Sequence, residues 1–398
     1  MLERTRVQSP FYTAEHEAFR DVMRRFVSRE IEPYAHEWDE AGEFPRELYR
    51  KASEIGLLGL GFPEEFGGVP ADQFMKIVAS QELACAGAGG VSSSLMSHTI
   101  GSPPIARAAR PEVKARVLPQ VLSGEKISAL AITEPSGGSD VANLRTKARR
   151  DGDHYVVNGH KTWTTLAQHA DWIFCLVRTD VAAKPQAGIS FLLIDMKSPG
   201  VIVRPIITID GSHEVNDAFL EDVRVPVENL IGEENKGWTY AKFLLGNERT
   251  SMAGIGRSTR YLNRLKQIVR AEIDDDDPSF GEFIKDIARV ELDVLALEAT
   301  ELRVVAQMSR GIDPGPAASL FKIRGTEIFQ RITDLTHQAI GNYGLAIREH
   351  PVSGNHFMPG PDYGHTASEK YLNSRKLSIY GGSNEIQRNI IAKAVLGL

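Results

Sequence analysis

The sequence contains very little cysteine and no long run of positive charge. Its 398 residues include two cysteines, Cys85 and Cys175, which stand far apart with no clustered histidine or further cysteine beside them. This spacing indicates neither a disulfide framework nor a zinc site, so we expect no metal and a reducing, cytoplasmic location. The 46 basic residues are outnumbered by 52 acidic ones. A nucleic-acid partner is therefore not expected.

Long apolar segments are also missing. The N-terminal residues MLERTRVQSPFY lack the apolar centre of a signal peptide, and no later segment has the roughly 20 uninterrupted apolar residues of a membrane helix. We therefore expect no membrane insertion. Hydrophobic residues still make up 42% of the chain, which is enough for large buried cores. The length predicts roughly two to three domains.

The spacing of apolar residues changes twice along the chain. Residues 1–126 are predicted to be a helical domain, with an apolar stripe from Phe19 to Ile31 and another helix from about Asp72 to Ala86. Residues 127–235 are predicted to be a central antiparallel β domain, since hairpin signals occur at Asp151-Gly152 and Asn158-Gly159. Its expected strands include Trp172–Val177, Ile189–Ile194 and Val201–Ile209.

Residues 236–398 are predicted to return to helix. The segment from Phe283 to Met308 is apolar over most of its circumference, which is typical of a helix inside a bundle. The acidic run Asp274 to Asp277 before it is expected to be a solvated loop. The predicted fold class is thus α+β and multidomain: a helical domain, a β domain and a C-terminal four-helix bundle.

A glycine pair near the C-terminus precedes the last predicted helix. Gly381 and Gly382 permit backbone conformations that other residues resist and allow a molecule to approach the main chain. Ser383 or Asn384 is a suitable helix cap. The apolar side of that helix is expected to run through Ile386, Ile390, Ala394 and Leu398. The pattern fits an anion-binding helix start, and it fits an ordinary loop and cap equally well.

A glutamate stands among apolar residues in AKFLLGNERTSMAGIG, residues 241–256. On a helical wheel Glu248 falls in the middle of the face that carries Leu244, Leu245 and Met252. Burial would raise the pKa of this carboxyl and make it a usable base near neutral pH. The alternatives are a small rotation of the helix or an ion pair with neighbouring Arg249.

Two further segments offer groups that could hold a cofactor. In ALAITEPSGGSDVANLRTKA, residues 129–148, Thr133 and the Gly137 to Ser139 run provide hydroxyls and approachable amides. Neither a dinucleotide fingerprint nor a P-loop is present, so a nicotinamide fold and an NTPase are disfavoured. In HKTWTTLAQHADW, residues 160–172, Trp163 and Thr165 alternate along an expected strand. A surface loop and a core tryptophan remain the alternative interpretations.

These segments, in this order, resemble the acyl-CoA dehydrogenase family over nearly the whole chain. The most specific motifs are Ala131 to Asp140, Lys161 to Thr165, Val223 to Pro226 and Tyr380 to Arg388. The resemblance implies FAD held between the β domain and the bundle. It also implies oxidation of an acyl-CoA thioester to trans-2-enoyl-CoA, as in fatty acid β-oxidation, with an electron-transfer flavoprotein as acceptor. An acyl-CoA oxidase and a non-catalytic FAD-binding subunit are the alternatives.

The resemblance also implies roles for individual residues. Thr133 would bond the edge of the flavin, Trp163 and Thr165 would cover one flavin face, and Gln338 would reach the FAD of a neighbouring subunit. The implied cofactor-binding residues are Leu130, Ile132, Thr133, Gly138, Ser139, Trp163, Thr165, Gln338, Ser383 and Glu385.

The chain departs from the commonest family pattern at the catalytic base. Many members have a glutamate at the position of Gly381, whereas isovaleryl-type and long-chain-type members have a small residue there and a glutamate at the position of Glu248. This chain has both features of the second type. The resemblance therefore implies Glu248 as base, Arg249 as its electrostatic orienter, and the Gly381 N–H as a donor to the thioester oxygen.

A second departure concerns assembly. The family usually has an Arg-x-x-Phe-Gly segment that clamps the FAD pyrophosphate of an adjacent subunit, but residues 274–281 read DDDDPSFG here. Aspartate would repel a phosphate. The segment from Gly360 to Gly382 resembles the large subunit of pimeloyl-CoA dehydrogenase, which is paired with a different subunit. Our hypothesis is a homo-oligomer or a hetero-oligomer with a second subunit of this kind.

Overall fold

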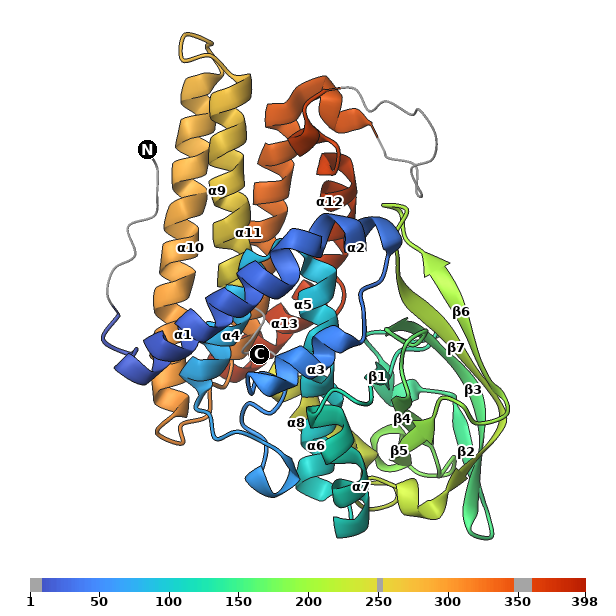
Figure 1. Cartoon of the computed structure of the whole chain (residues 1–398). Helices are drawn as coiled ribbons and strands as arrows, with labels where there is room; N and C mark the ends of the chain where they lie inside the picture. The colour runs from blue at the N-terminus through green and yellow to red at the C-terminus, as the bar shows by residue number, and fades with distance from the viewer. Residues whose placement is uncertain (1–8, 249–252, 347–359) are drawn as a thin grey trace.

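The computed structural model of the chain describes residues 9–248, 253–346 and 360–398, and for 244–248 it describes the backbone alone. Figure 1 shows three regions: short helices from the first third, a curled sheet on one side, and long helices from the last third. This order agrees with the predicted order of helical, β and helical regions. None of the helices in the described ranges has the length and hydropathy needed to cross a membrane.

The first region is helical because its apolar residues recur at helical spacing. The predicted stripe lies on α1 and the π-helical turn that follows it, where Met23, Phe26 and Ile31 are buried. The carboxylate of Asp72 accepts a hydrogen bond from the Met75 N–H at 2.9 Å and so caps α4. The helices are α1 (Ala14–Phe26), α2 (Ala35–Ala41), α3 (Glu47–Glu54), α4 (Gln73–Cys85), α5 (Gly89–Leu95), α6 (His98–Ala108) and α7 (Pro111–Leu122).

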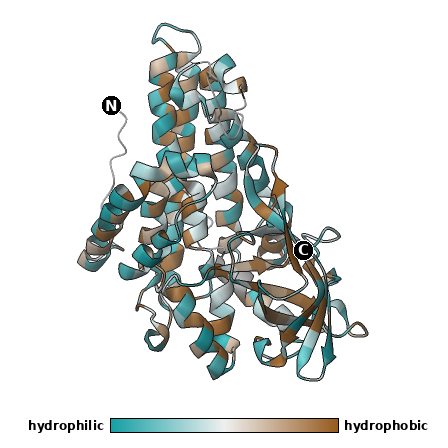
Figure 2. Cartoon of the chain, turned by 45° about the vertical axis from the view of Figure 1, so that its right-hand side comes forward, coloured by the Kyte–Doolittle hydropathy of each residue, from teal (hydrophilic) through white to brown (hydrophobic). Residues whose placement is uncertain are grey.

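The second region is a sheet with the strand order β1-β4-β2-β3-β7-β6, in which β5 also pairs with β4. The long β3–β7 and β4–β5 pairings are antiparallel, as predicted, whereas β1 runs parallel to β4. The strands are β1 (Ser128–Ala131), β2 (Lys147–Asp151), β3 (His154–Thr165), β4 (Trp172–Arg178), β5 (Ile189–Asp195), β6 (Val201–Ile207) and β7 (His213–Pro226). In Figure 2 hydrophobic colour follows much of these strands.

One of the two predicted hairpin turns is present. Asp151 pairs with His154 across the turn that contains Gly152. The turn predicted at Asn158-Gly159 was wrong, because both residues lie inside β3 at a register shift against β7. A Cβ at residue 159 would collide with Thr146, so the glycine permits close packing there and forms no turn.

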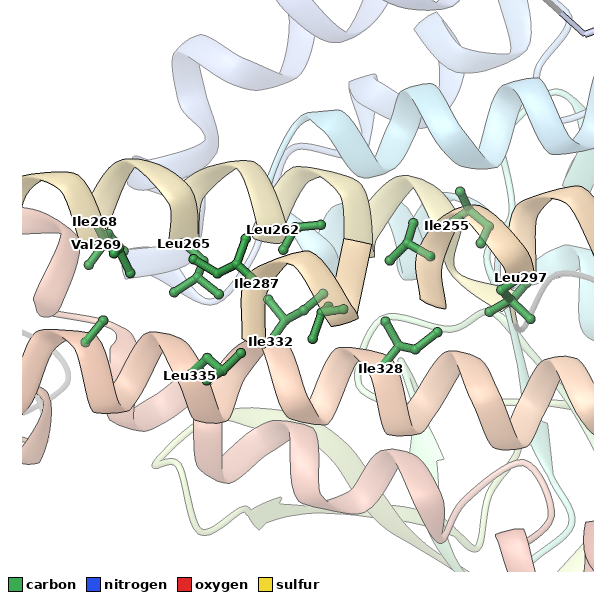
Figure 3. Close-up of a cluster of buried hydrophobic side chains, with 14 of the residues drawn as sticks. Ile255, Leu262, Leu265, Ile268, Val269, Ile287, Leu297, Ile328, Ile332 and Leu335 are labelled. Carbon is green, nitrogen blue, oxygen red and sulfur yellow. The ribbon is translucent and has the colours of Figure 1, made fainter. Parts of the chain in front are cut away.

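The third region contains the long helices. Figure 3 shows aliphatic side chains of α9, α10 and α11 meeting in one buried cluster, to which Leu265, Val294 and Ile332 belong. The acidic run from Asp274 to Asp277 is an exposed turn between α9 and α10, as predicted. The helices are α8 (Gly237–Glu248), α9 (Ile255–Glu272), α10 (Phe280–Met308), α11 (Ala317–Ile340), α12 (Ala367–Ser374) and α13 (Asn384–Ile391).

The helix α10 is less enclosed than its sequence predicts. Val290, Val294 and Leu297 are buried, but Leu292 is 66% exposed and Leu295 is 38% exposed. The apolar circumference therefore does not mean that this helix is surrounded within one chain. One side packs on α9 and α11, and the other faces outward.

Candidate active site

The Gly381-Gly382 turn lies directly before α13. Gly381 has φ 63° and Gly382 has φ 83°, both in the left-handed region that favours glycine. A Cβ on Gly382 would also collide with Nε2 of Gln387. Ser383 caps α13 by accepting a hydrogen bond from the Ile386 N–H at 3.4 Å, which confirms the predicted helix start. Both glycines are thus required by the backbone of this turn.

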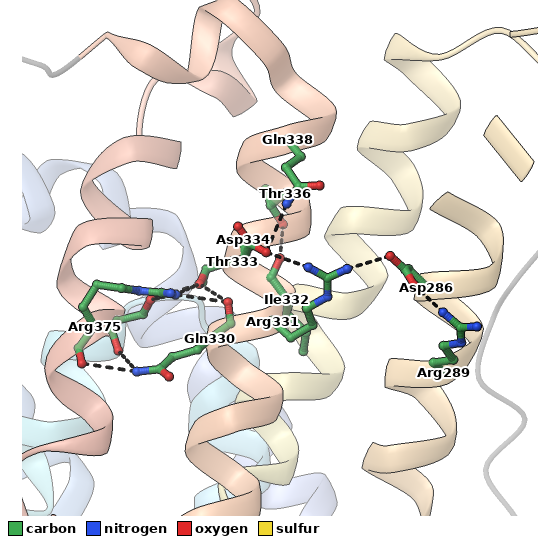
Figure 4. Close-up of polar contacts among 11 residues, drawn as sticks. Asp286, Arg289, Gln330, Arg331, Ile332, Thr333, Asp334, Thr336, Gln338 and Arg375 are labelled. Carbon is green, nitrogen blue, oxygen red and sulfur yellow. Dashed lines mark hydrogen bonds and ion pairs between the residues drawn. The ribbon is translucent and has the colours of Figure 1, made fainter. Parts of the chain in front are cut away.

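Polar side chains of α11 hold the segment around this turn. Ser319 donates to the Gln387 side chain at 2.8 Å, and the Asn384 amide donates to Thr326 at 3.1 Å. Gln330 donates to the Ser374 carbonyl at 3.0 Å, near the contact of Thr333 with Arg375 that Figure 4 shows. These side chains follow one another at intervals of seven, four and three residues and therefore lie on one face of the helix.

This packing reverses the orientation predicted for α13. Asn384 and Gln387 are buried against α11, whereas Ile386 is 37% exposed, and Val395, Leu396 and Leu398 beyond it are more exposed still. The expected apolar side is therefore not the side that faces this chain. The polar residues are buried because α11 offers them hydrogen-bond partners, which apolar spacing alone does not reveal.

A buried lysine and a partly buried arginine lie beside Tyr380, the residue before the glycines. The Lys322 ammonium donates to the Tyr380 carbonyl at 2.7 Å and also to the Leu377 carbonyl, and it lies 5.1 Å from the centre of the Tyr380 ring. The Arg257 guanidinium lies 4.1 Å from the centre of the Phe329 ring, and burial lowers its pKa while its hydrogen bond with the Tyr380 side chain opposes that shift. Positive charge thus gathers beneath this turn.

In the β domain, the Thr133 and Trp163 segments are neighbours. The Thr162 N–H donates to the Thr133 carbonyl at 3.0 Å, which joins the end of β1 to β3. Beneath this contact Lys161 forms a buried ion pair with Glu134 at 2.8 Å. Burial would raise the pKa of Glu134, but the charge of Lys161 and hydrogen bonds from Thr146 and Arg145 outweigh it and lower that pKa. The ion pair fixes the two segments side by side.

Trp163 projects from a strained point of β3. Its φ is 59°, which is unusual for a bulky residue, and the β3–β7 register shifts between Lys161 and Thr164. The side chain is 55% exposed, so the alternative of a core tryptophan is excluded for the described chain. Thr165 is exposed as well, whereas Thr164 between them is buried. The bulge therefore presents a flat aromatic side chain outward.

The other predicted cofactor residues occupy different surroundings. Leu130 and Ile132 are partly buried against an apolar core, and Gly138 and Ser139 lie in an exposed loop. Glu385 is exposed in the first turn of α13, where hydrogen bonds from its own N–H and from Ser383 lower its pKa.

Three predicted residues lie apart from the turn or are not fully described. Gln338 is exposed near the end of α11 and donates to Asp334 at 3.1 Å, as Figure 4 shows. Glu248 is the last residue of α8, with its backbone alone described, and Arg249 lies outside the described residues.

Hydrogen bonds tie the sheet to the segment that leads to the glycines. The Asn373 amide, on α12, donates to Asp210 in the β6–β7 turn at 2.9 Å and to Glu214 at the start of β7 at 2.8 Å. Lys376 forms an ion pair with Glu214. The β domain and the Gly381 turn are therefore parts of one connected structure.

Sequence reasoning missed Lys322, Arg257 and the Lys161–Glu134 pair. A usable signal was present for Lys322, because it belongs to a polar stripe with Ser319 and Thr326 along an otherwise apolar helix. The wheel argument that singled out Glu248 applies equally to this lysine. No comparable signal marks Arg257, whose partners lie far away in sequence.

Models of three protein domains match consecutive parts of the chain. The N-terminal domain of acyl-CoA dehydrogenase matches residues 13–125, its middle domain matches residues 129–223, and its C-terminal domain matches residues 235–396. The chain belongs to the acyl-CoA dehydrogenase family. It is therefore an oxidoreductase of a flavoprotein family.

Individual acyl-CoA dehydrogenases agree with this assignment. The acyl-CoA dehydrogenase FadE29 of Mycobacterium tuberculosis is 33% identical, over 96% of this chain and 97% of its own. A crystal structure of an acyl-CoA dehydrogenase from Mycobacterium smegmatis matches with a TM-score of 0.86 and 34% identity, covering 98% of this chain and 99% of that one. The ChsE4–ChsE5 complex of M. tuberculosis matches with a TM-score of 0.84 and 30% identity, covering 98% and 99%.

Proposed function

We propose that this protein catalyses FAD-dependent α,β-dehydrogenation of an acyl-CoA thioester to the trans-2-enoyl-CoA. The observation that carries the proposal is the Gly381 turn: a residue without a side chain, in a left-handed conformation, held on α11 beside buried Lys322 and partly buried Arg257. Within the described chain no acceptor is bonded to the Gly381 N–H. The turn therefore offers a hydrogen-bond donor, and helix α8 ends in a glutamate.

The chemistry requires a base and a site for developing negative charge. An α-proton beside a thioester is weakly acidic, so the carbonyl oxygen needs a hydrogen bond that strengthens as enolate charge develops. Glu248 removes that proton, Arg249 orients it, and the Gly381 N–H donates to the carbonyl oxygen. The absent side chain at residue 381 leaves room for the carboxylate from α8.

The exposed side chains of the β domain fit an isoalloxazine ring. Trp163 is held outward on a strained backbone that a merely structural tryptophan would not need, and this supports a role in covering a flavin face. Thr133 lies next to it and provides a contact to the edge of the ring. The nucleotide half of FAD would be bound by Gly138, Ser139, Ser383 and Glu385. When bound, FAD supplies the acceptor for the hydride that leaves the β-carbon.

The test of the base is Glu248→Gln in the FAD-loaded protein. Acyl-CoA substrates should bleach the flavin of the wild type and leave that of the variant oxidised, while the FAD content of both stays equal. Glu112→Gln, an exposed glutamate at the start of α7, is the matched control and should bleach like the wild type. Normal bleaching in Glu248→Gln would exclude this residue as the base.

The electrons are proposed to pass to an electron-transfer flavoprotein. Admission of air to the substrate-reduced protein separates this proposal from an oxidase. Slow reoxidation that the flavoprotein accelerates is the expected result. Rapid reoxidation with release of hydrogen peroxide would instead identify an acyl-CoA oxidase.

The working assembly is proposed to contain a second, different subunit of the same family. Outward-facing Leu292 on α10 and Leu396 beyond α13 are 66% and 67% exposed, and a partner would cover them. The exposed acidic turn from Asp274 to Asp277 cannot bind a pyrophosphate of that partner's FAD. Light scattering and the flavin-to-protein ratio of the purified protein test whether a second subunit is needed. An active, fully FAD-loaded homo-oligomer obtained from this chain alone would refute it.

A further inference from the structure

Lys322 is a fully buried cation that bonds main-chain oxygens of the glycine turn. It is 1% exposed, in the second turn of α11, and its ammonium donates to the carbonyls of Tyr380, at 2.7 Å, and Leu377. A hydrogen bond from an ammonium group to a carbonyl oxygen is charge-assisted, and it is roughly twice as strong as one from a neutral donor.

The peptide that Lys322 holds is the peptide that carries the Gly381 N–H. In a trans peptide the carbonyl of one residue and the N–H of the next lie in one plane and point in opposite directions. A donor on the Tyr380 carbonyl therefore fixes the plane and directs the Gly381 N–H away from α11. A cation on that oxygen also draws electrons through the amide and makes its N–H a stronger donor.

We propose that Lys322 is a positioning residue for the reaction, holding and polarising the Tyr380–Gly381 peptide so that its N–H binds the thioester oxygen as enolate charge develops. This inference rests on the proposed function, which makes that N–H the donor.

The glycines explain why such an anchor is needed. Gly381 and Gly382 adopt the left-handed conformations of this turn, but glycine also loses more conformational freedom on folding than any other residue. Tyr380 is fixed from two directions, because Arg257 bonds its side chain while Lys322 bonds its carbonyl. The turn is thereby held from α9 and α11, and its donor keeps one direction before substrate arrives.

The test compares Lys322→Met and Lys322→Gln with the wild type, all loaded with FAD. Methionine removes the donor and the charge, whereas glutamine keeps a neutral donor. Lys266→Met is the matched control, because Lys266 is a buried lysine of α9 that pairs with Glu291 at 2.7 Å, away from the turn. Each protein binds a 3-thia-acyl-CoA of the chain length that the wild type prefers, whose β-sulfur has no hydrogen to transfer.

The main measurement is the stretching frequency of the ¹³C-labelled thioester carbonyl. The wild type should lower it relative to the free analogue, Lys322→Met should lose most of that shift, and Lys322→Gln should retain an intermediate part. With a reactive substrate, kcat should fall by about 10- to 100-fold in Lys322→Met, with KM changing far less. Lys266→Met should keep the wild-type shift even if its Tm falls.

The outcomes separate this inference from the proposed function. An unchanged carbonyl shift in Lys322→Met, whatever its Tm or FAD content, would mean that the lysine supports the loop alone. If Lys322→Met does not fold, a full wild-type shift in Lys322→Gln would refute the polarising role equally well. A wild type that shows no carbonyl shift would contradict the proposed function itself.

Discussion

A buried glutamate on α10 should make the stability of this protein depend on pH. Glu301 is 5% exposed, and burial alone raises its pKa from an ordinary value of 4.5 to about 8. No charged group among the described residues contributes to this shift. Its helical neighbours Leu302 and Val305 belong to an apolar cluster with Phe74, so the charged form would be shielded from water and has no counter-ion among the described residues.

The direction follows from the raised pKa. The folded chain holds the Glu301 proton up to about pH 8, whereas the unfolded chain releases it near pH 4.5, so stability is highest below pH 4.5 and falls until about pH 8. Between about pH 6 and about pH 8.5, this one group should lower the free energy of unfolding by about 2.5 kcal/mol. For a chain of 398 residues that loss corresponds to about 3 °C in Tm.

The assay is thermal unfolding of the wild type and Glu301→Gln at both pH values. Glutamine is neutral and close in shape, so the variant should gain about 3 °C over the wild type on going from the lower to the higher pH. Glu282→Gln, an exposed position on the same helix, should show no such gain. Parallel pH profiles of Glu301→Gln and the wild type would show that this carboxyl does not titrate as its burial implies.

Two further predictions concern the β domain. Lys161→Met should lower the free energy of unfolding in urea by about 3–5 kcal/mol, because it leaves Glu134 buried without its cation. The double variant Lys161→Met, Glu134→Leu should recover most of that loss, and equal stability of the single and double variants would contradict this prediction. Trp163→Gly should relieve the backbone strain at φ 59° and leave Tm unchanged or higher, yet it should weaken the retention of FAD in a dilution assay. Trp163→Phe should retain FAD, and undiminished retention in the glycine variant would exclude a flavin contact.

Elements defined by their own periodicity were predictable. The strand expected from Trp172 to Val177 is β4, which extends one residue further, and the helix expected from Phe283 to Met308 is α10, which begins three residues earlier. In both cases apolar residues at a regular spacing supply the burial that stabilises the element. The stripe from Phe19 to Ile31 succeeded for the same reason, since it packs as one continuous face.

Features that depend on distant partners were not predictable in this way. Asn158-Gly159 resembles a hairpin turn, but Asn158 bonds Asp222 on β7 and the glycine packs on Thr146, so the strand continues through it. The polar side of α13 is buried because α11 supplies partners about 60 residues earlier. Spacing within one segment carries no information on such partners.

The candidate site likewise contains residues that the sequence reveals and residues that it does not. The motifs around Trp163 and Gly381 mark positions where the backbone is unusual, because the structure has a bulge at the first and a left-handed turn at the second. Motif resemblance therefore points to these positions, and their contacts with the substrate and FAD stay predictions. It does not find what holds them, because Lys322 and Arg257 act through the main chain and side chain of Tyr380 and need no fixed spacing from it.

The glycine at residue 381 and the lysine at residue 322 are best understood together. A side chain at residue 381 could be packed, and that packing would help to fix the turn; glycine offers nothing to pack. The turn must then be held through its own carbonyls, and a buried group that bonds two of them satisfies this need. With the proposed base on α8 and a glycine at residue 381, the direction of the Gly381 N–H depends on α11. A substitution at residue 322 should therefore change the hydrogen bond to the thioester carbonyl, although Lys322 itself bonds only the opposite side of the Tyr380–Gly381 peptide.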